Sequence, residues 1–194
     1  MKQWRITLWA AAVLLAAAPE AFPQAYRNDI GVPPTDVYQS MMGFAERKDF
    51  AKVSASLGTL KPIVGHIAAK YKENPAEAIK SAADQGSADK VTAGIRRLIA
   101  LDIKDLLDQA LQSAEGSQDS AKIAIKAARL NYELLSPEGQ KKDFGADQKI
   151  KRLFTEAFRV LGTESVFSGE KKQVDVGQLK QQLNEIIANL DQVT

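Results

Sequence analysis

The sequence predicts an all-α fold, namely a single-domain helical bundle of about six to seven helices built from antiparallel helix hairpins. Apolar residues recur at spacings of three and four along most of the chain, as on one face of a helix. No stretch of more than four residues alternates apolar and polar side chains as a half-buried strand does. With 194 residues and 45% hydrophobic content, the chain is long enough for one core and short for two.

The first 25 residues predict a secretory signal peptide. Lys2 and Arg5 precede an uncharged run, rich in Ala and Leu, over residues 6–18. A membrane-spanning helix needs about 20 apolar residues, so this run predicts cleavage and leaves no transmembrane segment afterwards. Small residues that fit a cleavage site stand at Ala18, Ala21 and Ala25. We favour Ala25, which divides the chain into a signal peptide at 1–25, an irregular leader at 26–34 and one helical domain at 35–194.

Composition excludes several classes of function. The signal is typical of a bacterial exported protein, so we expect a periplasmic or secreted location. Because the chain has no Cys, it cannot use disulfides, a thiolate zinc site, a c-type haem attachment or a cysteine nucleophile. The 26 Lys and Arg residues are scattered among 24 Asp and Glu residues without a basic stripe, so no nucleic-acid partner is expected.

The helices can be placed one after another from local signals. Thr35 is expected to cap a helix at 36–46, and Asp49 to begin a longer one that reaches Tyr71. Pro62 lies inside that longer helix and predicts a kink rather than an end. The segment Asn74-Pro75-Ala76-Glu77 combines an N-cap, a first-turn proline and a capping-box Glu. Further helices are expected at 75–83, 88–113, 119–135, 146–162 and 175–191, with a loop at 163–174.

The helix at 119–135 differs from the others because it is apolar on two faces. One face carries Ala121, Ala124, Ala128, Tyr132 and Leu135, and the other carries Ile123, Ala127, Leu130 and Leu134. Such a helix is expected to be covered on both sides, which places it near the centre of the bundle. The sequence Ser-Pro-Glu-Gly at 136–139 is expected to break it.

A weak internal repeat spans the first half. Lys52-Val53-Ser54-Ala55 recurs 38 residues later as Lys90-Val91-Thr92-Ala93, each time after a short helix. The repeat suggests two successive hairpins of a short and a long helix. Chance similarity between amphipathic helices explains it as well as duplication does, and it carries no functional inference.

Four polar residues form the candidate ligand-binding site. Asp102 lies in the middle of the apolar stripe of its helix and Arg96 at the edge of that stripe, while Asn131 lies between the two apolar faces of helix 119–135, next to Tyr132. If these side chains converge, they form a polar pocket for a cation or small polar ligand. We favour the alternative that Asp102 is a buried carboxylate paired with a polar neighbour to fix the helix register.

Other titratable residues point less clearly to a site. Asp105 and Asp108 are expected on the solvent face, because steps of three drift around a helix. His66 lies opposite the apolar stripe of its helix and lacks a carboxylate four residues away, so it is interpreted as a surface residue rather than a metal ligand. No catalytic residue and no cofactor is predicted, because the chain has no Gly-x-Ser-x-Gly elbow, no Gly-rich phosphate loop and no Glu-x-x-His pair.

Two functional hypotheses of different classes follow. The first is an exported, non-enzymatic helical protein, expected in the periplasm, that acts as an interaction or accessory module of the cell envelope, with another envelope protein as its partner. The alternative is a soluble periplasmic protein that binds a metal ion or small polar ligand in an interhelical pocket lined by Asp102, Arg96, Asn131 and Tyr132. An enzyme is a third reading, with no motif to support it. The metal, the ligand and the oligomeric state are not given by the sequence.

Overall fold

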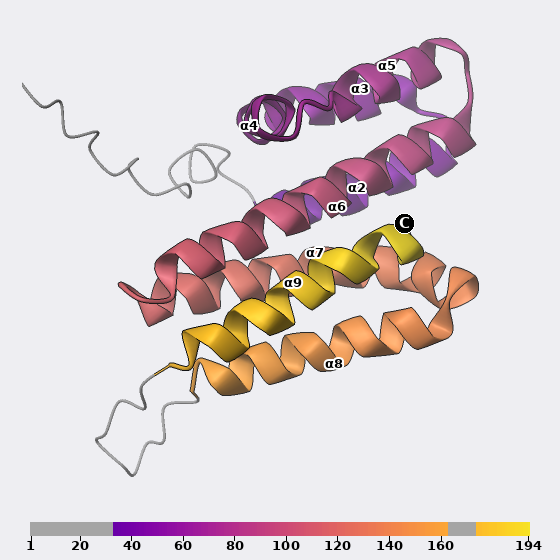
Figure 1. The fold of residues 1–194 in the computed structure, drawn as a ribbon. Coiled ribbons are helices and arrows are strands. Elements are labelled where there is room, and N and C mark those ends of the chain that lie inside the picture. The colour runs from indigo at the N-terminus through magenta and orange to yellow at the C-terminus, as the bar shows by residue number, and fades with distance from the viewer. Residues whose placement is uncertain (1–32, 163–173) are drawn as a thin grey trace, which may run out of the picture.

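The computed structural model describes residues 33–162 and 174–194, and within these ranges the chain forms α-helices and no strand (Figure 1). The predicted all-α bundle is confirmed, with slightly more helices than expected. The predicted signal peptide, most of the leader at 26–34 and most of the loop at 163–174 lie outside the described residues. The eight helices are α2 (Pro34–Glu46), α3 (Phe50–Thr59), α4 (Lys61–Tyr71), α5 (Pro75–Asp84), α6 (Ala88–Ser113), α7 (Gln118–Lys142), α8 (Phe144–Val160) and α9 (Val176–Val193).

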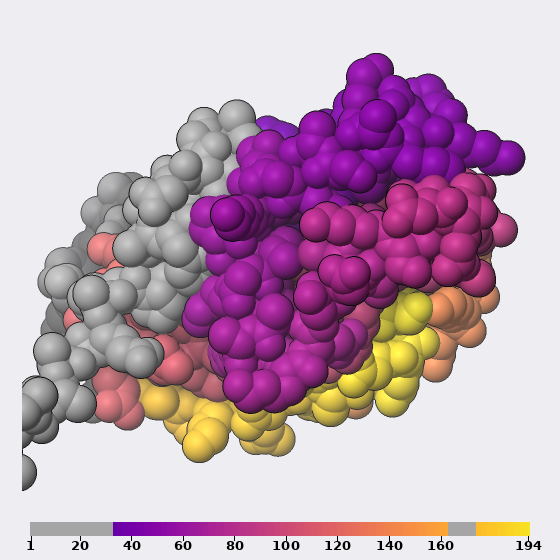
Figure 2. Space-filling model, turned by 90° about the horizontal axis from the view of Figure 1, so that it is seen from above, coloured from indigo at the N-terminus to yellow at the C-terminus, as the bar shows by residue number. Residues whose placement is uncertain are grey.

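Helix α6 is the centre of the bundle. It contacts α2, α4, α5, α7 and α9, and every residue from Leu98 to Ile103 is buried, so the helix is covered on all sides over that stretch. Figure 1 shows α3, α4 and α5 on one side of α6, and α7, α8 and α9 on the other. Seen from above, the N-terminal helices dominate the surface and α9 shows along one edge (Figure 2). Helix 119–135, which was expected near the centre, lies beside α6 as part of α7 and contacts α2, α6, α8 and α9.

The first helices depart from the predicted bounds at their prolines. Helix α2 begins at Pro34, with no side-chain cap, so Thr35 is inside the helix rather than at its cap. The expected kinked helix from Asp49 to Tyr71 is two helices, α3 and α4, which meet at Leu60. Pro62 has no N–H to bond the carbonyl four residues earlier, but it is well suited to a first helical turn, so the chain ends one helix and starts another.

Side-chain caps are present at three of the helix starts that the sequence predicts. The carboxylate of Asp49 accepts from the backbone N–H of Lys52, the amide oxygen of Asn74 from that of Glu77, and the carboxylate of Asp175 from that of Gln178. Each cap satisfies a backbone donor that the first turn of a helix leaves without a partner.

Helix α7 runs through the segment that was expected to end it. It continues to Lys142 with Pro137 inside, and both Pro137 and Glu133 are exposed. The carbonyl of Glu133, which loses its helical donor at Pro137, is thus on the solvent side, which lowers the cost of the proline. Gly139 is a packing residue rather than a breaker, because a Cβ there would lie 3.0 Å from the Cβ of Val193 in α9.

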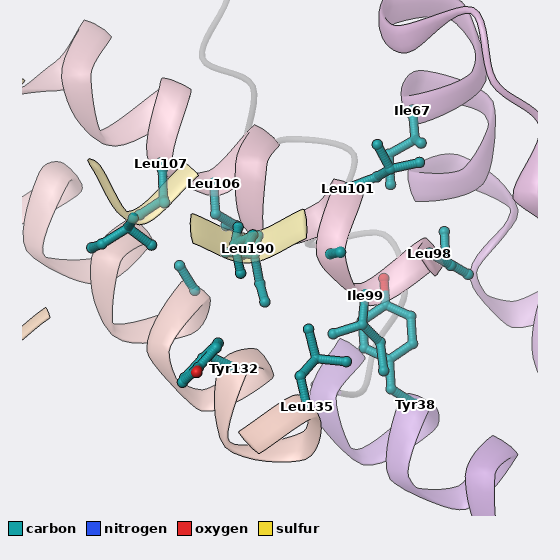
Figure 3. Packing of buried hydrophobic residues seen from close by; sticks show 14 of the residues in the cluster. Tyr38, Ile67, Leu98, Ile99, Leu101, Leu106, Leu107, Tyr132, Leu135 and Leu190 are labelled. Atoms are coloured by element: carbon teal, nitrogen blue, oxygen red, sulfur yellow. The ribbon is translucent and has the colours of Figure 1, made fainter. Parts of the chain in front are cut away.

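Buried apolar side chains from all eight helices form one core. Figure 3 shows Tyr38 of α2, Ile67 of α4, Leu135 of α7 and Leu190 of α9 turned toward the interior around α6. At about 25 cal/mol per Å² of buried apolar surface, such a core is the main stabilising contribution in a chain without disulfides. Within the described ranges, no helix has both the length and the apolar character needed to cross a membrane.

Candidate functional site

Two of the four predicted site residues meet. Asp102 is fully buried on α6, and its Oδ2 accepts a hydrogen bond of 2.8 Å from Nδ2 of Asn131 on α7. The Oδ1 atom of Asn131 in turn accepts a hydrogen bond of 2.6 Å from the hydroxyl of Thr35 on α2. These hydrogen bonds join α2, α6 and α7, so Asp102 is paired with a polar neighbour, and its role in fixing the helix register stays a prediction.

The other two predicted residues point elsewhere. Nη2 of Arg96 lies 3.4 Å from Oε2 of Glu138 in the C-terminal part of α7, and both side chains are half-buried. The hydroxyl of Tyr132 donates a hydrogen bond of 2.8 Å to Oδ1 of Asp147 on α8. Arg96 and Tyr132 therefore do not join Asp102 and Asn131 in a shared polar lining.

Asp147 is a buried carboxylate that the sequence analysis did not single out. It is fully buried, and besides Tyr132 it accepts from Nε2 of Gln148 at 3.2 Å and pairs with Nζ of Lys151 at 3.0 Å. Burial favours the neutral acid, but hydrogen bonds from Ser136, Lys151 and Tyr132 outweigh it and lower the pKa of Asp147. Burial first, and then the charge of Asp147, raise the pKa of Tyr132, so that this phenol stays protonated.

A second polar cluster lies between α4 and α6, around Asp105. This carboxylate is 1% exposed. Its Oδ1 lies 3.0 Å from Nε2 of His66 and 2.9 Å from Nζ of Lys70, and its Oδ2 accepts from Nε2 of Gln109 at 2.6 Å. The expected solvent position of Asp105 is wrong, and His66, which was interpreted as a surface residue, is half-buried beside this carboxylate. Helix α4 packs on the side of α6 that the sequence pattern assigned to solvent, and it brings His66 within reach across 39 residues of sequence.

Lys70 extends this cluster toward the surface. Its Nζ also pairs with Oδ2 of Asp108 at 2.6 Å, and the hydroxyl of Tyr71 donates to the same oxygen at 3.4 Å. Burial lowers the pKa of Lys70, but the hydrogen bonds to Asp108 and Asp105 outweigh that effect and raise it. Burial, reinforced by the charges of Asp108 and Asp105, raises the pKa of Tyr71. Lys70 is thus held as a cation and Tyr71 as a neutral phenol, and the two side chains join α4 to α6.

The polar clusters do not assemble a metal-ligand set among residues 33–162 and 174–194. No group of three or more His, Cys, Asp or Glu side chains in those ranges is arranged to hold a metal ion. Asp105 has one imidazole beside it, and its other contacts named above are an ammonium and an amide.

The most distinctive surface feature is on α7. Ile123 is 58% exposed and Leu130 is 49% exposed, and they lie seven residues apart on one side of the helix. Ala127 and Leu134, which are half-buried, continue the same apolar row. The face with Ala124, Ala128 and Leu135 is buried as predicted. The second apolar face, which was also expected to be covered, is covered only in part, because Ala127 and Leu134 pack against the core whereas Ile123 and Leu130 are exposed. We call this row, Ile123, Ala127, Leu130 and Leu134, the α7 outer face.

Comparisons of the chain with protein-family models, with curated proteins and with solved structures find no match. Among the described residues, the α7 outer face and the buried polar clusters are the two features that bear on function.

Proposed function

We propose that this chain is an exported helical protein that acts as an interaction or accessory module of the cell envelope, without a catalytic step of its own. The observation that carries the proposal is the α7 outer face. Single exposed apolar residues are common on protein surfaces, but a row on one face of a long helix is typical of a docking surface. The exposure of Ile123 and Leu130 gives that row two large side chains to bury on contact.

The buried polar groups support the same proposal. The carboxylates of Asp102, Asp105 and Asp147 each accept hydrogen bonds from side chains of the bundle itself. A buried charge that is paired in this way fixes how helices pack and needs no external ligand. We prefer this function to a metal- or solute-binding protein because Arg96 and Tyr132 are engaged away from Asp102.

The export part of the proposal rests on the first 25 residues. Lys2, Arg5 and the apolar run that follows have the composition of a signal peptide, and the compartment we propose is the periplasm or the outside of the cell. The mass of the chain isolated from the envelope fraction of its host tests this. Loss of a segment ending at Ala18, Ala21 or Ala25 is the expected result, whereas an intact chain in the cytosolic fraction would contradict export.

A photo-crosslinking amino acid at position 126, beside the α7 outer face, tests the interaction. The matched control is position 80 on α5, which is also an exposed lysine. In cells of the natural host, we expect a discrete crosslinked product from position 126 and none from position 80. If position 126 gives no product at native expression levels, the α7 outer face is not an interaction surface and the proposal fails.

A further inference from the structure

We infer that the α7 outer face binds a second copy of this chain, in an antiparallel arrangement with a two-fold axis at Leu130. The inference rests on the proposed function, because it names the partner of the same face. It is carried by a second, independent feature, which is the order of charges along the exposed side of α7.

The charges on this side have opposite signs at equal or nearly equal distances before and after Leu130. Asp119 stands 11 residues before Leu130 and Lys141 stands 11 residues after it. Lys126 stands four residues before it and Glu133 three residues after it. All four charged side chains are exposed. Helical rotation of 100° per residue places these positions within about 60° of Leu130 around the axis, so they flank the apolar row.

When two α7 helices pair antiparallel, this order of charges brings opposite charges together. In a two-fold arrangement a residue before the axis meets the residue equally far after the axis in the second copy. Asp119 then faces Lys141 of the second copy. Lys126 lies one residue, about 1.5 Å along the axis, out of register with Glu133 of the second copy, and the two flexible side chains span that offset. Each contact occurs twice, so the dimer has four pairs of opposite charge around a row in which Ile123 faces Pro137 of the second copy. A parallel pairing in the same register would instead place like charges together.

The charges are available for such pairing. Within the described ranges, Asp119 and Lys126 make no ion pair. Glu133 lies 3.8 Å from Nε of Arg129, and Nζ of Lys141 lies 3.4 Å from Glu138, both along the exposed helix. Exposed pairs of this kind contribute little to stability, so exchange for contacts with the second copy carries only a small penalty.

Contact through one helix face falls at the small end of specific interfaces, so we expect a weak dimer. Sedimentation equilibrium of the exported, processed protein should give a monomer–dimer equilibrium with a Kd of about 100 µM or below. A protein that stays monomeric up to about 500 µM would overturn the inference.

Charge variants test the register. Lys126→Glu places two pairs of like charge in the dimer, and we expect Kd to rise about tenfold. Lys80→Glu on α5 makes the same change of charge away from α7 and should leave Kd unchanged. The double variant Lys126→Glu with Glu133→Lys reverses both charges and should restore the wild-type Kd. Dimerisation that is insensitive to Lys126→Glu, or that the double variant fails to restore, would overturn the antiparallel arrangement.

The crosslinking experiment separates this inference from the proposed function. A product from position 126 that contains only this chain, at twice its mass, supports both. A product that contains a different polypeptide at position 126 supports the interaction module and overturns self-association. The absence of any product contradicts both.

Discussion

The two apolar faces of α7 have similar composition but differ in how far their side chains are exposed to solvent. On one face Ala124, Ala128 and Leu135 are buried against the rest of the bundle, while on the other Ile123 and Leu130 are about half exposed. The difference comes from the neighbours, because α2, α6, α8 and α9 contact α7 and leave Ile123 and Leu130 exposed. Apolar spacing thus predicts that a helix has two faces to cover, but it does not say whether the same chain covers both.

The largest expected effect is the loss of unfolding free energy when a side chain on the buried face of α7 is shortened, compared with the same change on the outer face. Ile125 is fully buried on α7, and Ile125→Ala should lower the free energy of unfolding by about 2–5 kcal/mol, because it leaves a cavity in the core. Leu130→Ala should change it by less than about 0.5 kcal/mol. Urea unfolding at low protein concentration, where the chain is monomeric, measures both. Equal losses for the two variants would mean that the outer face is part of the core.

A smaller effect is expected for the polar residue between the faces. Asn131→Ala removes the donor to the buried Asp102 and the acceptor of the Thr35 hydroxyl, which should cost about 2–3 kcal/mol of unfolding free energy. Glu133→Ala, two residues later on the exposed side, is the matched control and should cost less than about 0.5 kcal/mol. A loss near zero for Asn131→Ala would contradict a register-fixing role for the hydrogen bonds that join Thr35, Asn131 and Asp102.

Tyr132→Phe should cost about 1–2 kcal/mol, and its effect should depend on pH. The pKa of Asp147 is lowered in the folded state from its ordinary value of 3.8, so its stabilising contribution is present above that value and is lost as pH falls through the lower folded pKa. Without the hydroxyl of Tyr132, the folded pKa of Asp147 rises toward the ordinary value. The difference in stability between wild type and variant should therefore be constant at neutral pH and shrink below about pH 4. Unfolding curves between pH 3 and 7 measure it, and a difference that grows in acid would be contrary to this account.

The smallest expected effect on folding is that of Lys126→Glu, which should change the unfolding free energy by less than about 0.5 kcal/mol. The same substitution is expected to weaken self-association about tenfold. Thermal unfolding of the monomer, compared with the sedimentation result, separates folding from association. A large loss of monomer stability would show that Lys126 belongs to the fold rather than to the docking surface.

Local signals allowed the sequence to predict the helices and several of their starts. Asn74 and Asp175 are caps because their side chains act on backbone groups three residues away, and that spacing is visible in a sequence. Pro137 is a local signal that failed, because its cost depends on whether the carbonyl at Glu133 faces water.

The polar clusters depend on contacts that the sequence does not display. Asp102 could be singled out because an apolar stripe surrounds it, and its partner Asn131 was identified by the same anomaly. Asp105 carries no such mark, since steps of three along α6 were expected to place it toward solvent until α4 packs over it. Asp147 was missed although it carries the same mark as Asp102, because it lies three residues before Ile150 and seven before Phe154 on the apolar stripe of α8. His66 was judged by its own helix alone, whereas its carboxylate is supplied by α6.

Cysteine crosslinking tests the central claim, that α7 binds its own copy antiparallel about Leu130, most directly, because the chain contains no cysteine to interfere. A residue on a two-fold axis meets itself, so Leu130→Cys alone should give a disulfide-linked dimer on mild oxidation. Ile123→Cys alone should not, because two copies of that position would lie about 21 Å apart along the paired helices. A mixture of Ile123→Cys and Pro137→Cys chains should crosslink to each other. Dimers from Ile123→Cys alone, or none from Leu130→Cys, would contradict the account.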